Sequence, residues 1–265
     1  VDSLCYVIRL AYGYYRQTGD LSCFDADWDR AMRLIAATFR TEQRKDGTSP
    51  YRFSRTTSRM TDAPVFEGTG QPARPVGMIC SMFRPSDDAT ILPYLIPSNL
   101  FAVQSLRQLA EIYRQGLHDA AFAEECLRLA EEVEKAVKEW GTARHLHFGK
   151  IYAYEADGFG NRLFLDDSNV PSLLSLAYLG VHRPQDAMYR RTRDFVLSRY
   201  NPWYLEGRAA QGLGSPHTGK NHLWPMGIIL RGLTSRDAKE IRFCLHLLKT
   251  TDAGTGFMHE SFHKD

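Results

Sequence analysis

The segment FRPSDDA, residues 83–89, places two adjacent carboxylates, Asp87 and Asp88, between a proline turn and an apolar run. Because Pro85 disfavours a helical conformation for Arg84, the approach to the two acids should be extended. Acids on a turn that is backed by apolar side chains can have perturbed pKa values, which suits them to proton transfer. The same residues also have the chemistry of a helix N-cap, and the segment alone favours that simpler interpretation.

A second group of candidate residues is HESFH, residues 259–263, which matches the HExxH signature of zinc proteases with Glu260 as the base. That signature requires a helix to bring His259 and His263 to one face, whereas the sequence before it contains GTGF and has no helical stripe. A zinc hydrolase using these two histidines is therefore the weakest alternative. We predict no metal and no cofactor.

Two carboxylates that face each other across a pocket are the minimum for glycoside hydrolysis. The acids on the predicted loops, which are the candidates for such a pair, are Asp87, Asp88, Asp167, Glu206 and Glu260. A separation of roughly 6.5–9.5 Å between the carboxylates leaves room for a water and gives inversion, and about 5–5.5 Å gives retention. The thirteen Tyr, fourteen Phe and four Trp suit both a large core and clefts in which flat rings meet sugars.

The composition excludes several classes of partner. The 33 basic and 31 acidic residues nearly cancel, so the formal charge of +2 does not indicate a nucleic-acid partner. No apolar run approaches roughly 18 residues, so we predict no membrane partner. The five cysteines are odd in number, irregularly spaced and surrounded by apolar residues, which is typical of buried thiols in a reducing compartment. We therefore expect a cytoplasmic protein.

The elements that must position these acids follow from the hydrophobic periodicity. Apolar residues at helical spacing predict helices over residues 3–16, 28–42, 98–115, 119–140, 170–180, 185–199, 222–232 and 236–250. The predicted N-caps are Asp27, Ser98 or Asn99, Asp119, and the segment Asp167-Ser168-Asn169. A long loop, an apolar helix, a short turn and an amphipathic helix recur about four times. This pattern predicts an all-α chain of one domain, residues 1–265, built as an α/α toroid whose loops gather at one end around a ligand.

Several long motifs resemble one enzyme family. The run RPVGMICSMFRPSDDATILPYLIPSNLFAVQSLRQLAEIY, residues 74–113, resembles glycoside hydrolase family 125. The other matching motifs are VDSLCY (1–6), LDDSNVPSLLSLAYLG (165–180), SPHTGKNHLWPMGII (215–229) and TDAGTGFMHESFHKD (251–265). The resemblance implies an exo-acting α-mannosidase that removes terminal α-1,6-linked mannose from an oligosaccharide or N-glycan with inversion. It also implies an (α/α)6 barrel and no catalytic metal.

The resemblance assigns roles residue by residue. The general acid would be an aspartate of the SDD motif, with Asp87 favoured over its close rival Asp88, and the general base would be Glu260. The expected sugar contacts are Arg84, Asp167, Asn169, His222 and Trp224. Each of these five also has a purely structural interpretation, namely an ion pair for Arg84, helix caps for Asp167, Asn169 and His222, and a core aromatic for Trp224.

The chain departs from the family at its ends. The family has an upstream segment resembling MWLRDS, whereas this sequence begins at VDSLCY and ends after HESFHKD. The resemblance therefore implies a fragment with about four of six helical hairpins, and it does not imply that the fragment is active by itself. A carbohydrate-binding toroid without catalysis is the main alternative function.

Overall fold

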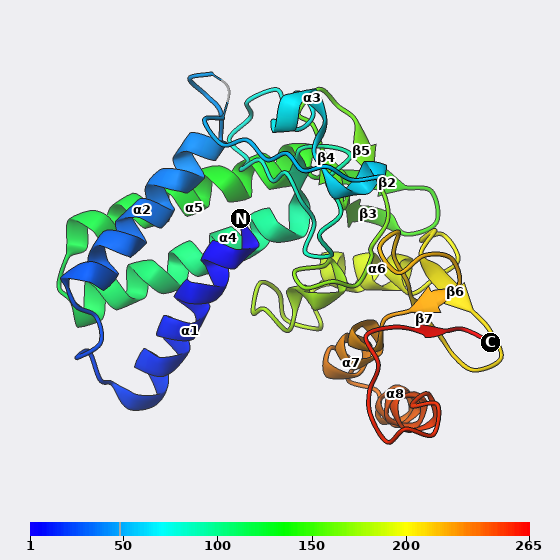
Figure 1. The fold of residues 1–265 in the computed structure, drawn as a ribbon. Helices are drawn as coiled ribbons and strands as arrows, with labels where there is room; N and C mark the ends of the chain where they lie inside the picture. Colours follow the sequence, from blue (N-terminus) through cyan, green and yellow to red (C-terminus); the bar gives the residue numbers. More distant parts are fainter. Residues whose placement is uncertain (48) are drawn as a thin grey trace.

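Helices carry most of the regular backbone in the computed structural model, which describes residues 1–47 and 49–265 (Figure 1). The helices are α1 (Asp2–Thr18), α2 (Ala26–Glu42), α3 (Val65–Gly68), α4 (Ile96–Glu111), α5 (Ala120–Trp140), α6 (Ala187–Val196), α7 (Pro225–Leu233) and α8 (Ala238–Thr250). The helix-rich class predicted from the sequence is confirmed.

Short strands, which the hydrophobic pattern did not predict as sheets, connect the loops. They are β1 (Tyr94–Leu95), β2 (Thr142–His145), β3 (Gly149–Tyr152), β4 (Glu155–Ala156), β5 (Arg162–Leu163), β6 (Tyr204–Glu206), β7 (Gln211–Leu213), β8 (His222–Leu223) and β9 (Phe262–His263). They form one antiparallel sheet in the order β1-β4-β5 and the antiparallel pairs β2-β3, β6-β7 and β8-β9. Strand β8 occupies the first two residues of the predicted helix 222–232, which begins at Pro225 instead. The other strands lie outside the predicted helices, so backbone pairing orders these loops.

The N-cap chemistry explains where the first helices begin. Helix α2 starts after Asp25, whose carboxylate accepts a hydrogen bond from the Trp28 backbone N–H at 2.9 Å, and not after the predicted cap Asp27. Asp27 lies inside the first turn, where its charge is favourable near the helix N-terminus. The prediction of Asp119 as the cap of α5 is confirmed by its bond to the Phe122 N–H at 3.0 Å.

Helix α4 is the central helix of the first group, and it is buried along almost its whole length. It begins at Ile96, two residues before the predicted cap, with Pro97 in its first turn. Ser98 is fully buried, and the Asn99 amide bonds both the N–H (2.7 Å) and the C=O (2.9 Å) of Ile79. The prediction of a cap at these two residues is therefore wrong, because the Asn99 side chain fastens a loop to the helix instead.

The predicted helix over residues 170–180 is also wrong, because this segment forms turns and a short 3-10 helix, Leu174–Leu176. The hydroxyl of Ser175 accepts from the Ser172 N–H (2.8 Å), and the Ser172 hydroxyl accepts from the Ser175 N–H (3.1 Å). Such local side-chain bonds to the backbone compete with helix formation. The apolar spacing that suggested a helix reflects burial of the turns.

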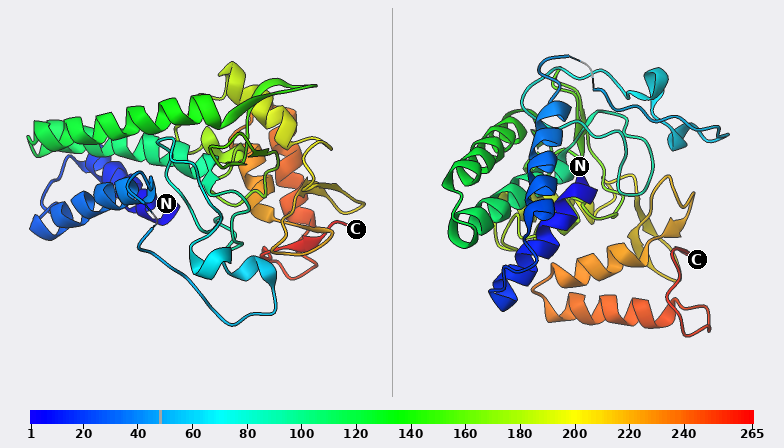
Figure 2. Two further views of the ribbon diagram at one scale, coloured as in Figure 1. Left: turned by 90° about the horizontal axis from the view of Figure 1, so that it is seen from above. Right: turned by 60° about the vertical axis from the view of Figure 1, so that its left-hand side comes forward.

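Figures 1 and 2 show two groups of helices with the long loops between them. Helices α1, α2, α4 and α5 form one group, and α6, α7 and α8 form the other. In the second group, Glu240 of α8 accepts hydrogen bonds from Arg193 of α6 (2.9 Å) and Arg231 of α7 (2.8 Å). We refer to these three residues as the Glu240 cluster. Within the described residues, none of the helices combines the length and the apolar character that a membrane crossing requires.

Candidate active site

A cavity of about 410 Å³ lies where four loop segments meet the first turns of α7. Its lining residues are Pro85, Ser86, Asp87, Asn169, His217, Trp224, Pro225, Met226, Ile229, Met258, His259 and Glu260. Two carboxylates from distant parts of the sequence, Asp87 and Glu260, therefore line one cavity, and both residues are exposed. We call this the site cavity.

Asp87 is presented by a tight turn. The Asp87 N–H donates to the Arg84 carbonyl (3.0 Å), and the Arg84 N–H donates to the Asp88 carbonyl (2.8 Å). A bridge between Phe83 and Ala89 closes this small loop. Asp87 adopts a left-handed backbone conformation with φ 65°, a conformation that aspartate tolerates better than most residues. The turn directs Asp87 to the surface, while the residue after it is buried.

A buried ion pair supports the turn from below. The Arg84 Nε donates to the Glu155 Oε1 at 2.6 Å, and the two side chains are 2% and 0% exposed. The other Glu155 oxygen accepts from the backbone N–H groups of Ile91 (3.0 Å) and Leu92 (2.9 Å). Burial raises the pKa of Glu155 because the cost of desolvation exceeds the stabilising effect of the Arg84 charge. Glu155 of β4 therefore holds the turn on both sides, through Arg84 before Asp87 and through the backbone of Ile91 and Leu92 after it.

Asp167 supports the same turn from the other side and is fully buried. Its carboxylate accepts hydrogen bonds from the Tyr154 hydroxyl (2.7 Å) and the Ser86 hydroxyl (3.1 Å). Burial raises the pKa of Asp167, although Arg84 and these hydrogen bonds act in the opposite direction. Asp167 thus connects the turn of Asp87 to the neighbouring loop.

The adjacent acid, Asp166, holds the backbone of that loop. Its carboxylate accepts from the N–H groups of Ser168 (2.8 Å), Leu173 (2.6 Å) and Leu174 (3.3 Å). Burial, together with the neighbouring Asp167 carboxylate, raises the pKa of Asp166 to about 7. This second acid pair is therefore a support for the loop between β5 and α6.

Glu260 is anchored on both sides of its position. After it, strand β9 pairs with β8, which places Phe262 opposite Leu223 directly before the first turn of α7. Before it, the Asp252 carboxylate accepts from the Gly254 and Gly256 N–H groups at 3.1 Å and 2.9 Å. The pairing of β8 with β9 brings Glu260 to the wall that contains Trp224.

The structure brings together some of the predicted site residues. Of the eight, Asp87, Glu260, Asn169 and Trp224 line the site cavity. Among the described residues, four predicted site residues do not line this cavity, namely Arg84, Asp88, Asp167 and His222. Asp88 is buried at 1% exposure, and His222 lies in β8, where its Nδ1 is 3.0 Å from the Lys220 carbonyl oxygen.

The HExxH match does not have the geometry of a zinc protease. Residues 259–263 form a bend and strand β9, so His259 and His263 are not on one face of a helix. The His259 Nε2 is 3.1 Å from the Asp252 backbone oxygen, and the His263 Nδ1 is 3.4 Å from that of Asp265. Across residues 1–47 and 49–265, no group of three or more His, Cys, Asp or Glu side chains is arranged to hold a metal ion.

Sequence reasoning missed several residues that build the site. The pattern gave no signal for Glu155, which is fully buried in the two-residue strand β4, or for the hydroxyl of Tyr154. His217 also lines the site cavity, and its ring stacks against Trp224 with centroids 6.1 Å apart. The motif SPHTGKNHLWP contains both rings, so their proximity in sequence was a usable signal for His217.

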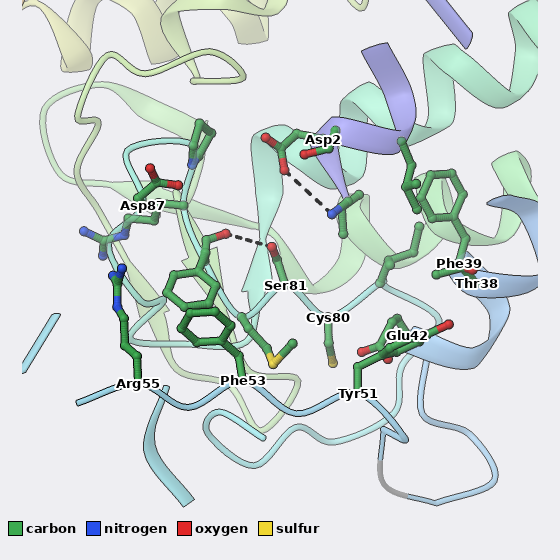
Figure 3. A pocket seen from close by; sticks show the side chains of 18 residues that line it. Asp2, Thr38, Phe39, Glu42, Tyr51, Phe53, Arg55, Cys80, Ser81 and Asp87 are labelled. Carbon is green, nitrogen blue, oxygen red and sulfur yellow. Dashed lines mark hydrogen bonds and ion pairs between the residues drawn. The ribbon is translucent and has the colours of Figure 1, made fainter. Parts of the chain in front are cut away.

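A second cavity, of about 620 Å³, lies on the other side of Asp87 (Figure 3). Figure 3 shows Asp2 and Asp87 along one side of it, and Tyr51, Phe53 and Arg55 along the opposite side. The loop that carries these three residues connects α2 to α3. Asp87 therefore lies between two cavities.

Two carboxylates at the wall of an open cavity, with an aromatic side chain beside them, are residue types that glycoside hydrolysis requires. The family model described as "Metal-independent alpha-mannosidase (GH125)" matches residues 1–265. The chain belongs to this family, which confirms the resemblance seen in the sequence.

Two known proteins illustrate the similarity. The meiotically up-regulated gene 157 protein of Schizosaccharomyces pombe is 40% identical over 271 residues, covering 98% of this chain and 53% of that protein. A solved structure of a metal-independent α-mannosidase from Streptococcus pneumoniae, in a non-productive complex with α-1,6-mannobiose, has a TM-score of 0.96 and 42% identity. The match covers 100% of this chain and 62% of the solved chain. The chain thus spans about half of the curated relative and less than two thirds of the solved one.

Proposed function

We propose that this chain carries the catalytic carboxylates of an exo-acting α-mannosidase that hydrolyses terminal α-1,6-linked mannose with inversion. The observation that carries the proposal is the joint lining of one cavity by Asp87 and Glu260. Membership of the GH125 family supports the substrate class, and the mannobiose bound to the solved relative supports the linkage. The substrate would be a mannose-containing oligosaccharide or N-glycan.

In the proposed mechanism Asp87 is the general acid and Glu260 is the general base. Glu260 takes a proton from a water whose oxygen forms a bond to C1 of mannose. The bond between C1 and the glycosidic oxygen breaks, and that oxygen receives the proton of Asp87. The products are β-mannose and the shortened alcohol, with Asp87 ionised and Glu260 protonated. Both residues are exposed, so exchange with solvent restores their starting states.

The position of Asp87 supports its role as the acid. The proton goes to the oxygen between the terminal sugar and the leaving group, so the acid must reach the boundary of two subsites. Asp87 lines both the site cavity and the second cavity, whereas Glu260 lines the site cavity. We therefore place the terminal mannose in the site cavity and the leaving group toward the second one.

The proposed architecture is an (α/α)6 toroid to which this chain contributes one catalytic domain, with about four of the hairpins. Apolar side chains on α1 support this, because Tyr6, Val7, Leu10 and Tyr14 are exposed and Leu10 reaches 76%. Exposed apolar surface on a helix is commonly a packing surface. We also propose a reducing, cytoplasmic location, which the five free cysteines support; four of them are buried as expected, whereas Cys23 is exposed.

The test uses the complete gene product that contains residues 1–265, with α-1,6-mannobiose as the substrate. We expect NMR to detect β-mannose as the first product. The substitutions Asp87→Asn and Glu260→Gln should each lower kcat by roughly 10²–10⁴-fold, the usual contribution of an acid or base. The matched control is Asp27→Asn, since the Asp27 side chain is 79% exposed on α2 and should be neutral.

Four outcomes would contradict parts of the proposal. Appearance of α-mannose first would exclude inversion. Unchanged hydrolysis by the Glu260→Gln variant would remove its role as the base. Loss of activity on chelation, with recovery on adding zinc, would favour the zinc hydrolase. Binding of mannobiose by a wild-type protein that does not hydrolyse it would instead identify a carbohydrate-binding module, and calorimetry measures that binding.

A further inference from the structure

The carboxylate of Asp88 is buried but not hydrogen-bonded. The residue is 1% exposed, and among the described residues neither of its side-chain oxygens has a hydrogen-bond partner. A buried polar group in this condition is costly, and each such group in a native protein needs an explanation. Within residues 1–47 and 49–265, the basic nitrogen that lies within 4 Å of this carboxylate is the Nδ1 of His217, at 3.7 Å from Oδ1.

His217 is the side chain that connects Asp88 to the site cavity. Its own Nδ1 is buried and, in the described part of the chain, has no hydrogen-bond partner. The imidazole stacks on the indole of Trp224 at an interplanar angle of 24°. Ser215 fixes the indole of Trp224 and the backbone of His217, because its hydroxyl accepts from the Trp224 Nε1–H (2.9 Å) and from the His217 backbone N–H (3.1 Å). Two unpartnered groups therefore face each other behind the cavity wall.

We infer that Asp88 is a positioning residue which orients His217, and that His217 binds a sugar hydroxyl in the site cavity through Nε2. The inference rests on the proposed function, because it assumes a sugar in this cavity. An N–H···O bond has its partners at about 2.7–3.2 Å, so a small rotation of the imidazole closes the present separation. The Asp88 carboxylate then accepts the Nδ1–H and fixes the tautomer.

The fixed tautomer decides what the cavity offers to a ligand. With Nδ1–H bonded to Asp88, the neutral imidazole presents the Nε2 lone pair as a hydrogen-bond acceptor. A sugar hydroxyl is a donor that suits this acceptor. The two neighbouring acids then have separate tasks: Asp87 lines both cavities and reaches the reacting oxygen, and Asp88 acts on the ligand through His217.

The test combines kinetics with NMR on the complete gene product that contains this chain. Kinetic constants for α-1,6-mannobiose are measured for His217→Ala, Asp88→Ala, Asp88→Asn and the double alanine variant. We expect KM to rise about tenfold for each single alanine variant, the effect of one lost hydrogen bond. The double variant should be no worse than either, because Asp88 acts through His217. Asparagine keeps a neutral acceptor and should restore part of the affinity.

The spectroscopic measurement does not need substrate. In protein labelled with ¹⁵N-histidine, His217 should be the Nδ1–H tautomer, and Asp88→Ala should abolish that preference. The matched controls are Asp27→Ala and His246→Ala, which change exposed side chains on α2 and α8 and should alter neither measurement. Melting temperatures show which variants remain folded, and the tautomer is read in the wild type even if a variant unfolds.

The outcomes separate this inference from the proposed function. Additive losses in the double variant, or an Nε2–H tautomer of His217 in the wild type, overturn the role of Asp88. A wild-type protein that does not hydrolyse mannobiose overturns the proposed function. In that case the orienting role of Asp88 is decided by NMR, from the Nδ1–H tautomer of His217 in the wild type and its loss in Asp88→Ala. If His217 binds the sugar, added mannobiose should shift the NMR signals of His217. Unchanged signals overturn this binding role.

Discussion

Replacing Glu155 by glutamine removes the charge that balances Arg84 beneath the turn of Asp87. Both side chains are at most 2% exposed and their atoms are 2.6 Å apart, so solvent does not screen the charge that remains. Breaking a buried ion pair by removing one partner costs about 3–5 kcal/mol. Glutamine has one acceptor oxygen, so it also cannot serve both Arg84 and the backbone N–H groups of Ile91 and Leu92. We expect a loss of about 3–5 kcal/mol in the free energy of unfolding.

The assay measures unfolding in denaturant and hydrolysis of α-1,6-mannobiose in parallel. For a protein of this size the loss corresponds to a fall in Tm of about 10 °C. Because the turn that presents Asp87 is fixed by this pair, kcat should also fall, by roughly 10²-fold for a displacement near 1 Å. The matched control is Glu124→Gln, whose exposed partner Arg114 is 3.2 Å away and whose pair should be worth less than about 1 kcal/mol.

A double substitution separates the charge from the shape. Changing Arg84 and Glu155 together to methionine removes both charges, and apolar replacement of a buried pair is often neutral or stabilising. The double variant should therefore be more stable than Glu155→Gln alone. An unfolding free energy for Glu155→Gln within about 1 kcal/mol of the wild type, with normal hydrolysis, would refute the argument that this pair holds the turn.

Two further predictions concern the elements around the site. Burial raises the pKa of Glu240, but hydrogen bonds with Ser235 and Arg231 and the charge of Arg193 outweigh burial and hold that pKa below its usual value. The stabilising effect of Glu240 is therefore present at neutral pH and is lost as pH falls through the lowered pKa. Glu240→Gln should therefore cost about 2 kcal/mol near neutral pH and progressively less below about pH 4, measured by denaturation at each pH; a pH-independent cost would contradict this. Gly68→Ala should destabilise the loop of the second cavity by more than about 2 kcal/mol, because φ is +82° and a Cβ would overlap the Phe53 carbonyl. Gly70→Ala is its control, because its φ is +79° but its Cβ would make only an ordinary van der Waals contact, 3.9 Å from the Met82 Cγ. Equal costs for the two variants would contradict the overlap.

The hydrophobic period was sufficient to predict helices where burial on one face decides the structure. Helix α5 follows its apolar stripe closely, and Asp119 caps it as predicted. The period failed for residues 170–180, where buried turns have the same apolar spacing as a helix. There the hydroxyls of Ser172 and Ser175 satisfy backbone N–H groups locally, a competition that spacing does not report.

The supporting network of the site was not predictable for a different reason. Glu155 lies 71 positions from Arg84 and belongs to a strand of two residues, too short to show alternation. The sequence shows its partner Arg84 only as an arginine close to Asp87 and Asp88. Long-range pairing of polar side chains depends on how the loops fold over one another, so the sequence could offer the catalytic candidates without the residues that hold them.

Asp87 and Asp88 show most clearly why the roles of site residues depend on the fold. Asp87 and Asp88 have the same side chain and adjacent places in one motif, so residue chemistry alone is no basis for choosing between them. The backbone makes the difference, because Asp87 has a left-handed φ of 65° and its N–H closes the turn onto Arg84. That conformation exposes one carboxylate to both cavities and buries the next. The proposed division into an acid and a positioning residue therefore follows from the turn and not from the chemistry of the two side chains.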